Sequence, residues 1–109
     1  MNLMNTLPAF NILISYDADN ELWQAHCLEM DLMETGESRL ECIKSLFRII
    51  PAQIQESIKE NIHYLHPAPA EFFQMLERAH PVSIDELVQE NSMPSILNSI
   101  YVGEVRNHV

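Results

Sequence analysis

A long series of apolar residues at helical spacing dominates the middle of this chain. Its members recur every three or four positions: Leu40, Ile43, Phe47, Ile50, Ile54, Ile58, Ile62 and Leu65. This period places one apolar stripe along one side of a helix, and such a stripe needs another apolar surface to cover it. The sequence therefore predicts one long helix that lies across a sheet.

The start and the interior of this helix carry further signals. Ser38 and Glu41 form a capping box, in which each side chain accepts a hydrogen bond from a free backbone amide. Pro51 removes one backbone donor and its ring clashes with the preceding turn, so we expect a kink or a break between Arg48 and Pro51. Pro67 is expected to end the helix.

Two segments before the helix alternate between apolar and polar residues, as half-covered strands do. The apolar positions on one face are Phe10, Ile12, Ile14 and Tyr16 in the first segment, and Trp23, Ala25 and Cys27 in the second. Residues 17–21 between them are turn formers, so the two strands are expected to form a hairpin. A third, shorter strand is predicted over residues 32–35 and ends at Gly36.

The pattern is weaker after residue 66. Residues 71–78 can form a short helix that presents Phe72 and Phe73 to an apolar surface. Residues 83–86 form a second capping box, which opens a helix expected to end before Pro94. A last strand is predicted within residues 96–105, which are rich in β-branched and aromatic side chains.

These patterns divide the chain into two parts. Residues 1–66 are predicted to form a small α+β domain. Residues 67–109 are predicted to form a helical and extended appendage that packs on the same domain or on a second protomer. A chain of 109 residues is too short for two separate cores.

The charge of the chain is strongly one-sided. Sixteen acidic and six basic residues give a net charge of −10, which repels polyphosphate and disfavours direct binding of nucleic acid. A basic protein partner is easier to accommodate, although the acids could also serve only to keep the chain in solution.

No apolar run reaches the roughly 20 residues of a membrane helix, and residues 1–10 do not resemble a signal peptide. We therefore expect a soluble, cytoplasmic protein without membrane contact.

The turn of the hairpin imitates part of a calcium loop. Asp17, Asp19 and Glu21 have the spacing of the first calcium ligands. The glycine and the terminal glutamate that such a loop requires are replaced by Leu22 and Leu28. The sequence thus favours an ordinary turn.

The histidines and cysteines show no convincing metal pattern. His26 and Cys27 are neighbours on a strand and are expected to face opposite sides of the sheet. His63 and His66 are expected one turn apart at the end of the helix, where the helix dipole favours them without a metal. Cys27 and Cys42 do not have the CxxC spacing, and both are expected to remain reduced thiols. No metal site and no cofactor are predicted.

Four acids after the second strand, Glu29, Asp31, Glu34 and Glu37, could in principle form a carboxylate catalytic site. No base, nucleophile or phosphate clamp accompanies them, so we predict no catalytic residue and no enzymatic activity. A solvated acidic edge that protects an exposed strand is the preferred interpretation.

Trp23 is the only tryptophan of the chain. A tryptophan at this position of a strand is most simply a core residue. At a hairpin it could instead anchor an interface with a partner.

Several of these residues occur in an order that is typical of one family. They are the Asp17-x-Asp19 turn, Trp23-x-Ala25-x-Cys27-Leu28-Glu29, Asp31-Leu32, Gly36, Ser38 and Glu41. In this order, residues 10–65 resemble the N-terminal domain of HicB-type antitoxins. The resemblance implies a β-β-β-α-β unit, described as a partial RNase H-like fold without its catalytic acids, and a role in binding.

The resemblance also implies a partner. Antitoxins of this family neutralise a small basic toxin that cleaves mRNA, by covering its RNA-binding surface and its catalytic histidine. The net charge of −10 suits such a role, because complementary charge speeds and orients association. Two-domain members end in a DNA-binding module, whereas residues 67–109 hold only Arg78 and Arg106 against six acids, so repression by this chain is not expected.

The sequence therefore predicts an α+β protein with a small antiparallel sheet packed on one long helix. Its predicted function is that of an antitoxin-like, homodimeric protein that binds a small basic toxin. The predicted contact residues are Asp17, Asp19, Glu21, Glu29, Asp31, Glu34 and Glu37. The alternative is a dimeric module without a toxin partner, in which Phe72 and Phe73 are buried between protomers.

Overall fold

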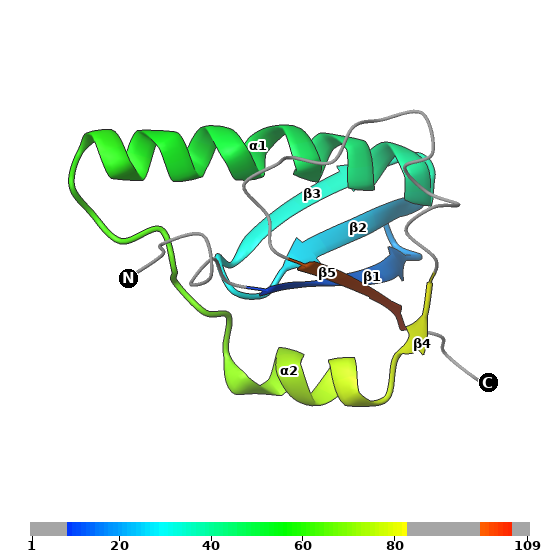
Figure 1. The fold of residues 1–109 in the computed structure, drawn as a ribbon. Helices are drawn as coiled ribbons and strands as arrows, with labels where there is room; N and C mark the ends of the chain where they lie inside the picture. The colour runs from blue at the N-terminus through cyan, green and yellow to red at the C-terminus, as the bar shows by residue number, and fades with distance from the viewer. Residues whose placement is uncertain (1–8, 83–98, 106–109) are drawn as a thin grey trace.

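The chain forms a five-stranded sheet with a long helix on one face and a shorter helix on the other (Figure 1). A computed structural model describes residues 9–82 and 99–105. In chain order the elements are β1 (Ala9–Asp17), β2 (Leu22–Cys27), β3 (Leu32–Gly36), α1 (Arg39–Lys59), α2 (Ala70–Glu77), β4 (His80–Pro81) and β5 (Ser99–Glu104). The predicted combination of a sheet and a long helix is confirmed.

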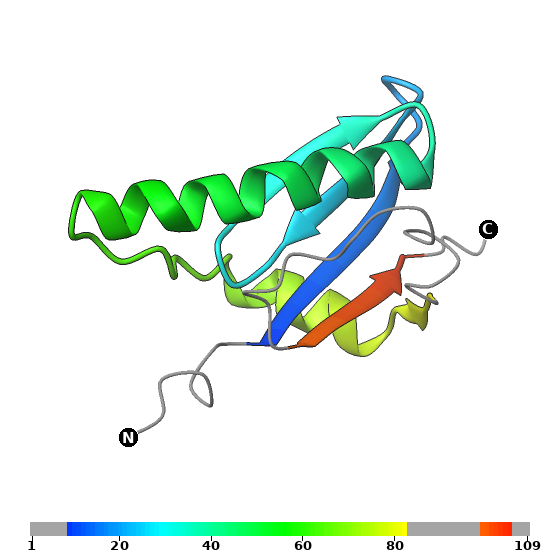
Figure 2. The same cartoon turned by 45° about the horizontal axis from the view of Figure 1, so that its top comes forward.

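The strands lie in the order β3-β2-β1-β5-β4. The hairpin of β1 and β2 is confirmed, with Tyr16 opposite Trp23 next to the turn. The predicted last strand is also confirmed as β5, but it runs parallel to β1, so the sheet is not antiparallel throughout (Figure 2). β5 is antiparallel to β4, the element before it in the chain.

The C-terminal part of the chain completes the sheet that the N-terminal part begins. β5 lies directly beside β1, and β4 pairs with β5 at the edge. The described residues of the predicted appendage therefore pack on the same domain. The second capping box at residues 83–86, and the helix expected after it, lie outside the described residues.

The main core lies between α1 and the sheet. The apolar alternation of β1 and the apolar stripe of α1 meet here, as the two periodicities predict. The buried members are Phe10, Ile12, Ile14, Ala25, Cys27, Met30, Cys42, Ile43, Leu46, Phe47, Ile50, Ile54 and Val102.

Helix α1 begins where the capping box predicts. The Ser38 hydroxyl accepts a hydrogen bond from the Glu41 amide at 3.1 Å, and the Glu41 carboxylate accepts one from the Glu37 amide at 3.1 Å. Gly36 allows the first turn to approach β3 closely, because a Cβ at this position would lie 2.6 Å from the backbone nitrogen of Cys42. The cap and the glycine together set the position of the helix on the sheet.

The end of α1 differs from the prediction, and of the kink or break expected near Pro51 the break is absent. The helix continues through Pro51, and Ile50 and Ile54 on either side of it are buried in the core. It ends at Lys59, and Asn61 has a φ of 59°, in the left-handed region. The predicted continuation of the stripe to Leu65 was therefore wrong, and the last helical member, Ile58, is 66% exposed because it reaches beyond the sheet.

A second, smaller core lies on the opposite face of the sheet. Leu13 and Leu28 are buried there beneath α2, together with Ala68. The link after α1 is guided to this face by a hydrogen bond of 2.7 Å from the Ala68 amide to the Leu28 carbonyl. The helix predicted over residues 71–78 is confirmed as α2. Its residues Phe72 and Phe73 both pack against this cluster.

Candidate partner-binding surface

The seven acids of the predicted contact surface do not lie together. Asp17, at the end of β1, lies next to Asp19 and Glu21 of the β1–β2 turn. Glu37 lies at the same end of the sheet, because it follows Gly36, which pairs with Trp23 near the start of β2. The acids of the other end are Glu29 and Asp31, in the β2–β3 turn, and Glu34 lies between the two groups on β3. A strand rises about 3.4 Å per residue, so the two turns are separated by about 17 Å.

The two acids of the β2–β3 turn are occupied within the chain. The Glu29 carboxylate accepts hydrogen bonds from the backbone amide of Asn11 at 2.6 Å and from its side-chain amide at 2.7 Å. Asp31 contacts Nε2 of His26 at 2.7 Å, and the ring of this buried histidine packs edge-on against Phe72. Both acids thus fasten the turn to the second core, and their predicted role in partner binding stays a prediction.

The β1–β2 turn is ordered by one of its own acids. The Asp17 carboxylate accepts hydrogen bonds from the amides of Asp19 and Asn20 and, at 2.7 Å, from the Asn20 side chain. These hydrogen bonds lower the pKa of Asp17 below its ordinary value, and the bond from the Asn20 side chain has the largest effect. The carboxylate therefore stays ionised. Glu21 has a φ of 54°, which allows the tight return of the chain into β2.

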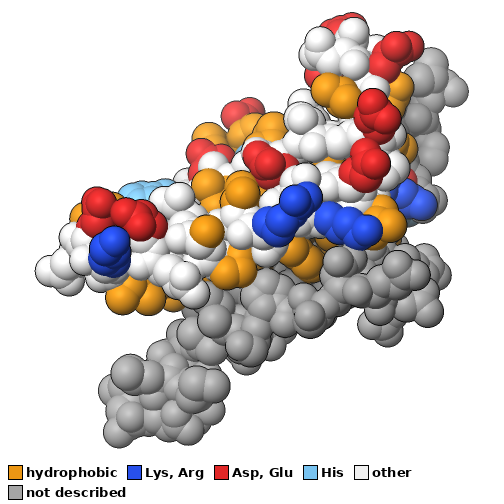
Figure 3. Space-filling view, turned by 90° about the horizontal axis from the view of Figure 1, so that it is seen from above, with side chains coloured by type: hydrophobic (Ala, Val, Ile, Leu, Met, Phe, Trp, Pro, Cys, Tyr) orange, Lys and Arg blue, Asp and Glu red, His pale blue; other side chains and the backbone are white. Residues whose placement is uncertain are grey.

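The remaining acids at this end face solvent without a cationic partner. Within the described ranges the ion pairs are His26–Asp31 and Arg39–Glu104, and neither includes Asp19, Glu21 or Glu37. Figure 3 shows acidic side chains on the protruding hairpin end, and both acidic and basic side chains along α1. The hairpin end, which we define by Asp17, Asp19, Glu21 and Glu37, is therefore a concentrated negative surface.

The same end carries two residues that the sequence did not identify as part of a site. Tyr16 is 45% exposed although it continues the buried alternation of β1, and the Arg39 side chain is 41% exposed at the start of α1. The sequence signal for their exposure is the position of the capping box, because a helix that begins at residue 39 covers only part of the preceding hairpin. How much of the hairpin the helix covers depends on the packing of α1 and not on spacing in the sequence.

The residues considered as metal ligands do not converge. Cys27 lies in the core beneath α1 while His26 faces α2, so their predicted placement on opposite faces is confirmed. His63 and His66 lie in the link after α1, and the expectation that they share a helical turn was wrong. Within the described part of the chain, no three His, Cys, Asp or Glu side chains are grouped as metal ligands are.

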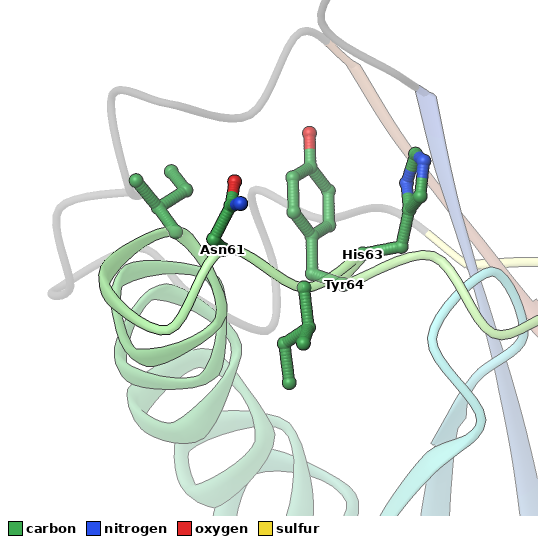
Figure 4. Close-up of a pocket in the computed structure, with 5 residues that line it drawn as sticks. Asn61, His63 and Tyr64 are labelled. Carbon is green, nitrogen blue, oxygen red and sulfur yellow. The ribbon is translucent and has the colours of Figure 1, made fainter.

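A hollow of about 290 Å³ lies at the far end of α1, where the chain leaves the helix. It is lined by Ile58, Asn61, Ile62, His63 and Tyr64, and Figure 4 shows the side chains of Asn61, His63 and Tyr64 rising on the same side of the chain. Among the described residues, this lining contains no carboxylate and no thiol.

The two thiols are buried in the main core as reduced cysteines. Removal from water disfavours the thiolate and raises the pKa of Cys27 from 9.0 to about 12 and that of Cys42 to about 11. Neither thiol therefore has the lowered pKa and the exposure of a nucleophile.

The raised thiol pKa values predict a loss of stability in alkali. Below pH 9 the thiols are protonated in both the folded and the unfolded state. Above it only the unfolded state releases protons, until the folded-state pKa values of about 11 and 12 are passed. Each thiol should then lower the free energy of unfolding by about 1.4 kcal/mol per pH unit. Urea titrations between pH 8 and 11 measure this loss. The Cys27→Ala/Cys42→Ala variant should show a shallower pH dependence, and an equal slope in both proteins would contradict the prediction.

No helix in the described ranges is long and apolar enough to cross a membrane. Comparison with models of protein families, with curated proteins and with solved structures found no match for this chain.

Proposed function

We propose that this chain is an acidic, antitoxin-like binding protein that masks a small basic protein of the kind that cleaves mRNA. The observation that carries the proposal is the hairpin end, where Asp19, Glu21 and Glu37 face solvent without cationic partners in the described part of the chain. The succession of three strands, a long helix and a later strand agrees with the unit that the HicB resemblance implies. This succession of elements supports the proposal, and the proposed binding role requires no catalytic group.

The physical role of the hairpin end follows from its charge. A cluster of ionised carboxylates creates a local negative potential that attracts a basic surface and orients it during encounter. The RNA-binding surface of an mRNA-cleaving protein must itself be basic, because it holds phosphates. An acidic surface that occupies it competes directly with RNA.

Charge removal at the hairpin end should weaken this binding. The ligand for isothermal titration calorimetry is the small basic protein encoded in the neighbouring reading frame. The Asp19→Asn/Glu21→Gln variant is expected to raise the Kd about tenfold, and to make binding less sensitive to salt, because two steering charges are lost. The Glu56→Gln/Glu60→Gln variant is the matched control, since it removes two exposed charges at the other end of α1.

The outcomes of this titration are distinct. Absence of binding by the unmodified chain, or absence of such a basic protein, would overturn the proposed function. Equal weakening by the two variants would show that only net charge matters, and would remove the hairpin end as the site.

The proposal includes a cytoplasmic location, where mRNA is cleaved, and a homodimer that does not bind nucleic acid directly. Phe72 and Phe73, the predicted dimer residues, already pack on the second core of their own chain. A dimer that uses α2 must therefore rely on the exposed part of this helix, which includes Met75 at 38% exposure. Light scattering coupled to size exclusion measures the oligomeric state, and a monomer would contradict this part of the proposal.

A further inference from the structure

The sheet and α1 are offset along the direction of the strands. Ile14 of β1 is fully buried beneath the helix, whereas Tyr16, two positions further on the same face, is 45% exposed. The difference arises because α1 begins at Arg39 and leaves the last residues of the hairpin uncovered. An apolar part of the sheet therefore reaches the surface at the hairpin end.

The side chains at this end of the sheet hold one another in place, and Trp23 among them is partly buried against the main core. Tyr16 lies opposite Trp23 in the β1–β2 ladder, and their rings meet edge-on with centroids 5.2 Å apart. The guanidinium carbon of Arg39 lies 5.9 Å from the centre of the Trp23 ring. The same guanidinium donates a hydrogen bond of 2.7 Å to the largely buried Glu104 carboxylate. We call Tyr16, Trp23 and Arg39 the aromatic patch.

The aromatic patch lies at the same end of the molecule as the acids of the hairpin end. Glu37 follows Gly36, the residue paired with Trp23, and Asp17 follows Tyr16 at the end of β1. The one cation of the patch, Arg39, is balanced by Glu104. An apolar surface and a group of exposed acids therefore lie at one end of the molecule.

We propose that the aromatic patch is the anchor of the partner interface, and that the partner places an apolar side chain flanked by Lys or Arg residues on it. This inference rests on the proposed function. Trp, Tyr and Arg are the side chains that most often dominate binding free energy at interfaces. Here they are already held by mutual contacts, so little side-chain entropy remains to be lost on binding.

The charges select the class of partner. A second copy of this chain would bring the same group of acids toward its own, and opposed like charges are unfavourable. A basic surface instead meets the carboxylates while its apolar side chain covers the rings. The aromatic patch is therefore suited to a different, basic protein rather than to self-association.

The single tryptophan allows a direct test of this anchor. Trp23 can be replaced by 5-fluorotryptophan throughout the chain, and its one ¹⁹F signal then reports only on this position. The probe is the purified small basic protein encoded in the neighbouring reading frame. Addition of this basic protein is expected to shift the ¹⁹F signal of the labelled Trp23. It is also expected to shield that signal from a soluble paramagnetic agent.

Substitutions complete the test. Tyr16→Thr, which keeps a strand-forming residue, is expected to raise the Kd for this probe at least tenfold in calorimetry. Ile58→Ala, at the exposed far end of α1, is the control and should leave the Kd unchanged. Thermal melting of both variants establishes that they are folded.

Three results separate the inference from the proposed function. A ¹⁹F shift together with selective weakening by Tyr16→Thr supports the aromatic patch as the anchor. Binding without a ¹⁹F shift, and with equal Kd values for the two variants, overturns the anchor but leaves the proposed function standing. Absence of binding overturns both.

Discussion

A chain truncated after residue 66 is expected to lose its cooperative fold. The truncation removes β5, which lies beside β1 within the sheet, and turns β1 into an edge strand. It also removes α2 and Ala68, so Leu13 and Leu28 of the second core become exposed to water. Loss of both an interior strand and one apolar layer exceeds the few kcal/mol by which a domain of this size is stable.

Circular dichroism and amide NMR spectra of the truncated chain measure this loss. We expect no cooperative thermal transition and poorly dispersed amide signals. The full-length chain is the reference and should show a cooperative transition and well-dispersed signals. A truncated protein with a sharp transition would show that residues 1–66 form an independent domain, contrary to the sheet order observed here.

Ile50→Ala is expected to lower the free energy of unfolding by 2–5 kcal/mol, on the order of known large-to-small core substitutions. Ile50 is fully buried between α1 and the sheet, so its shortening removes apolar contacts and leaves a cavity. Ile58→Ala changes the same residue type in the same helix at a site that is 66% exposed, and should cost no more than about 0.5 kcal/mol. Urea denaturation of both variants measures the difference. Similar losses in the two variants would mean that α1 is not seated on the sheet as described.

The locally encoded elements were predictable from the sequence. The turn formers at residues 17–21 and the alternation on either side define the hairpin, and Ser38 with Glu41 defines the start of α1. In each case the signal and the structure that it forms lie within a few residues of each other. The residue types therefore act before the rest of the fold is known.

The errors of prediction arise where distant parts of the chain decide the outcome. The apolar period continues past Lys59, but the sheet that should cover it does not, so the helix ends before Leu65. Pro51 does not break the helix, and Ile50 and Ile54 on either side of it are buried in the core. The parallel pairing of β5 with β1 joins segments from opposite ends of the chain, which no local pattern records.

The candidate site was predictable in composition and not in arrangement. The sequence shows seven acids near β2 but not that Glu29 and Asp31 are bound by Asn11 and His26 within the chain. These contacts require the two residues to face the second core, which only the register of β1 and β2 establishes. The exposed acids of the hairpin end emerge as a separate group once the register is known.

The two edges of the sheet differ in a way that bears on assembly. β4 has only two residues and ends at Pro81, which has no backbone N–H to offer a further strand. β3 is five residues long and contains no proline. Among the described residues, β3 is thus the edge that is better suited to strand addition between chains, and two chains joined through β3 would form a closed pair.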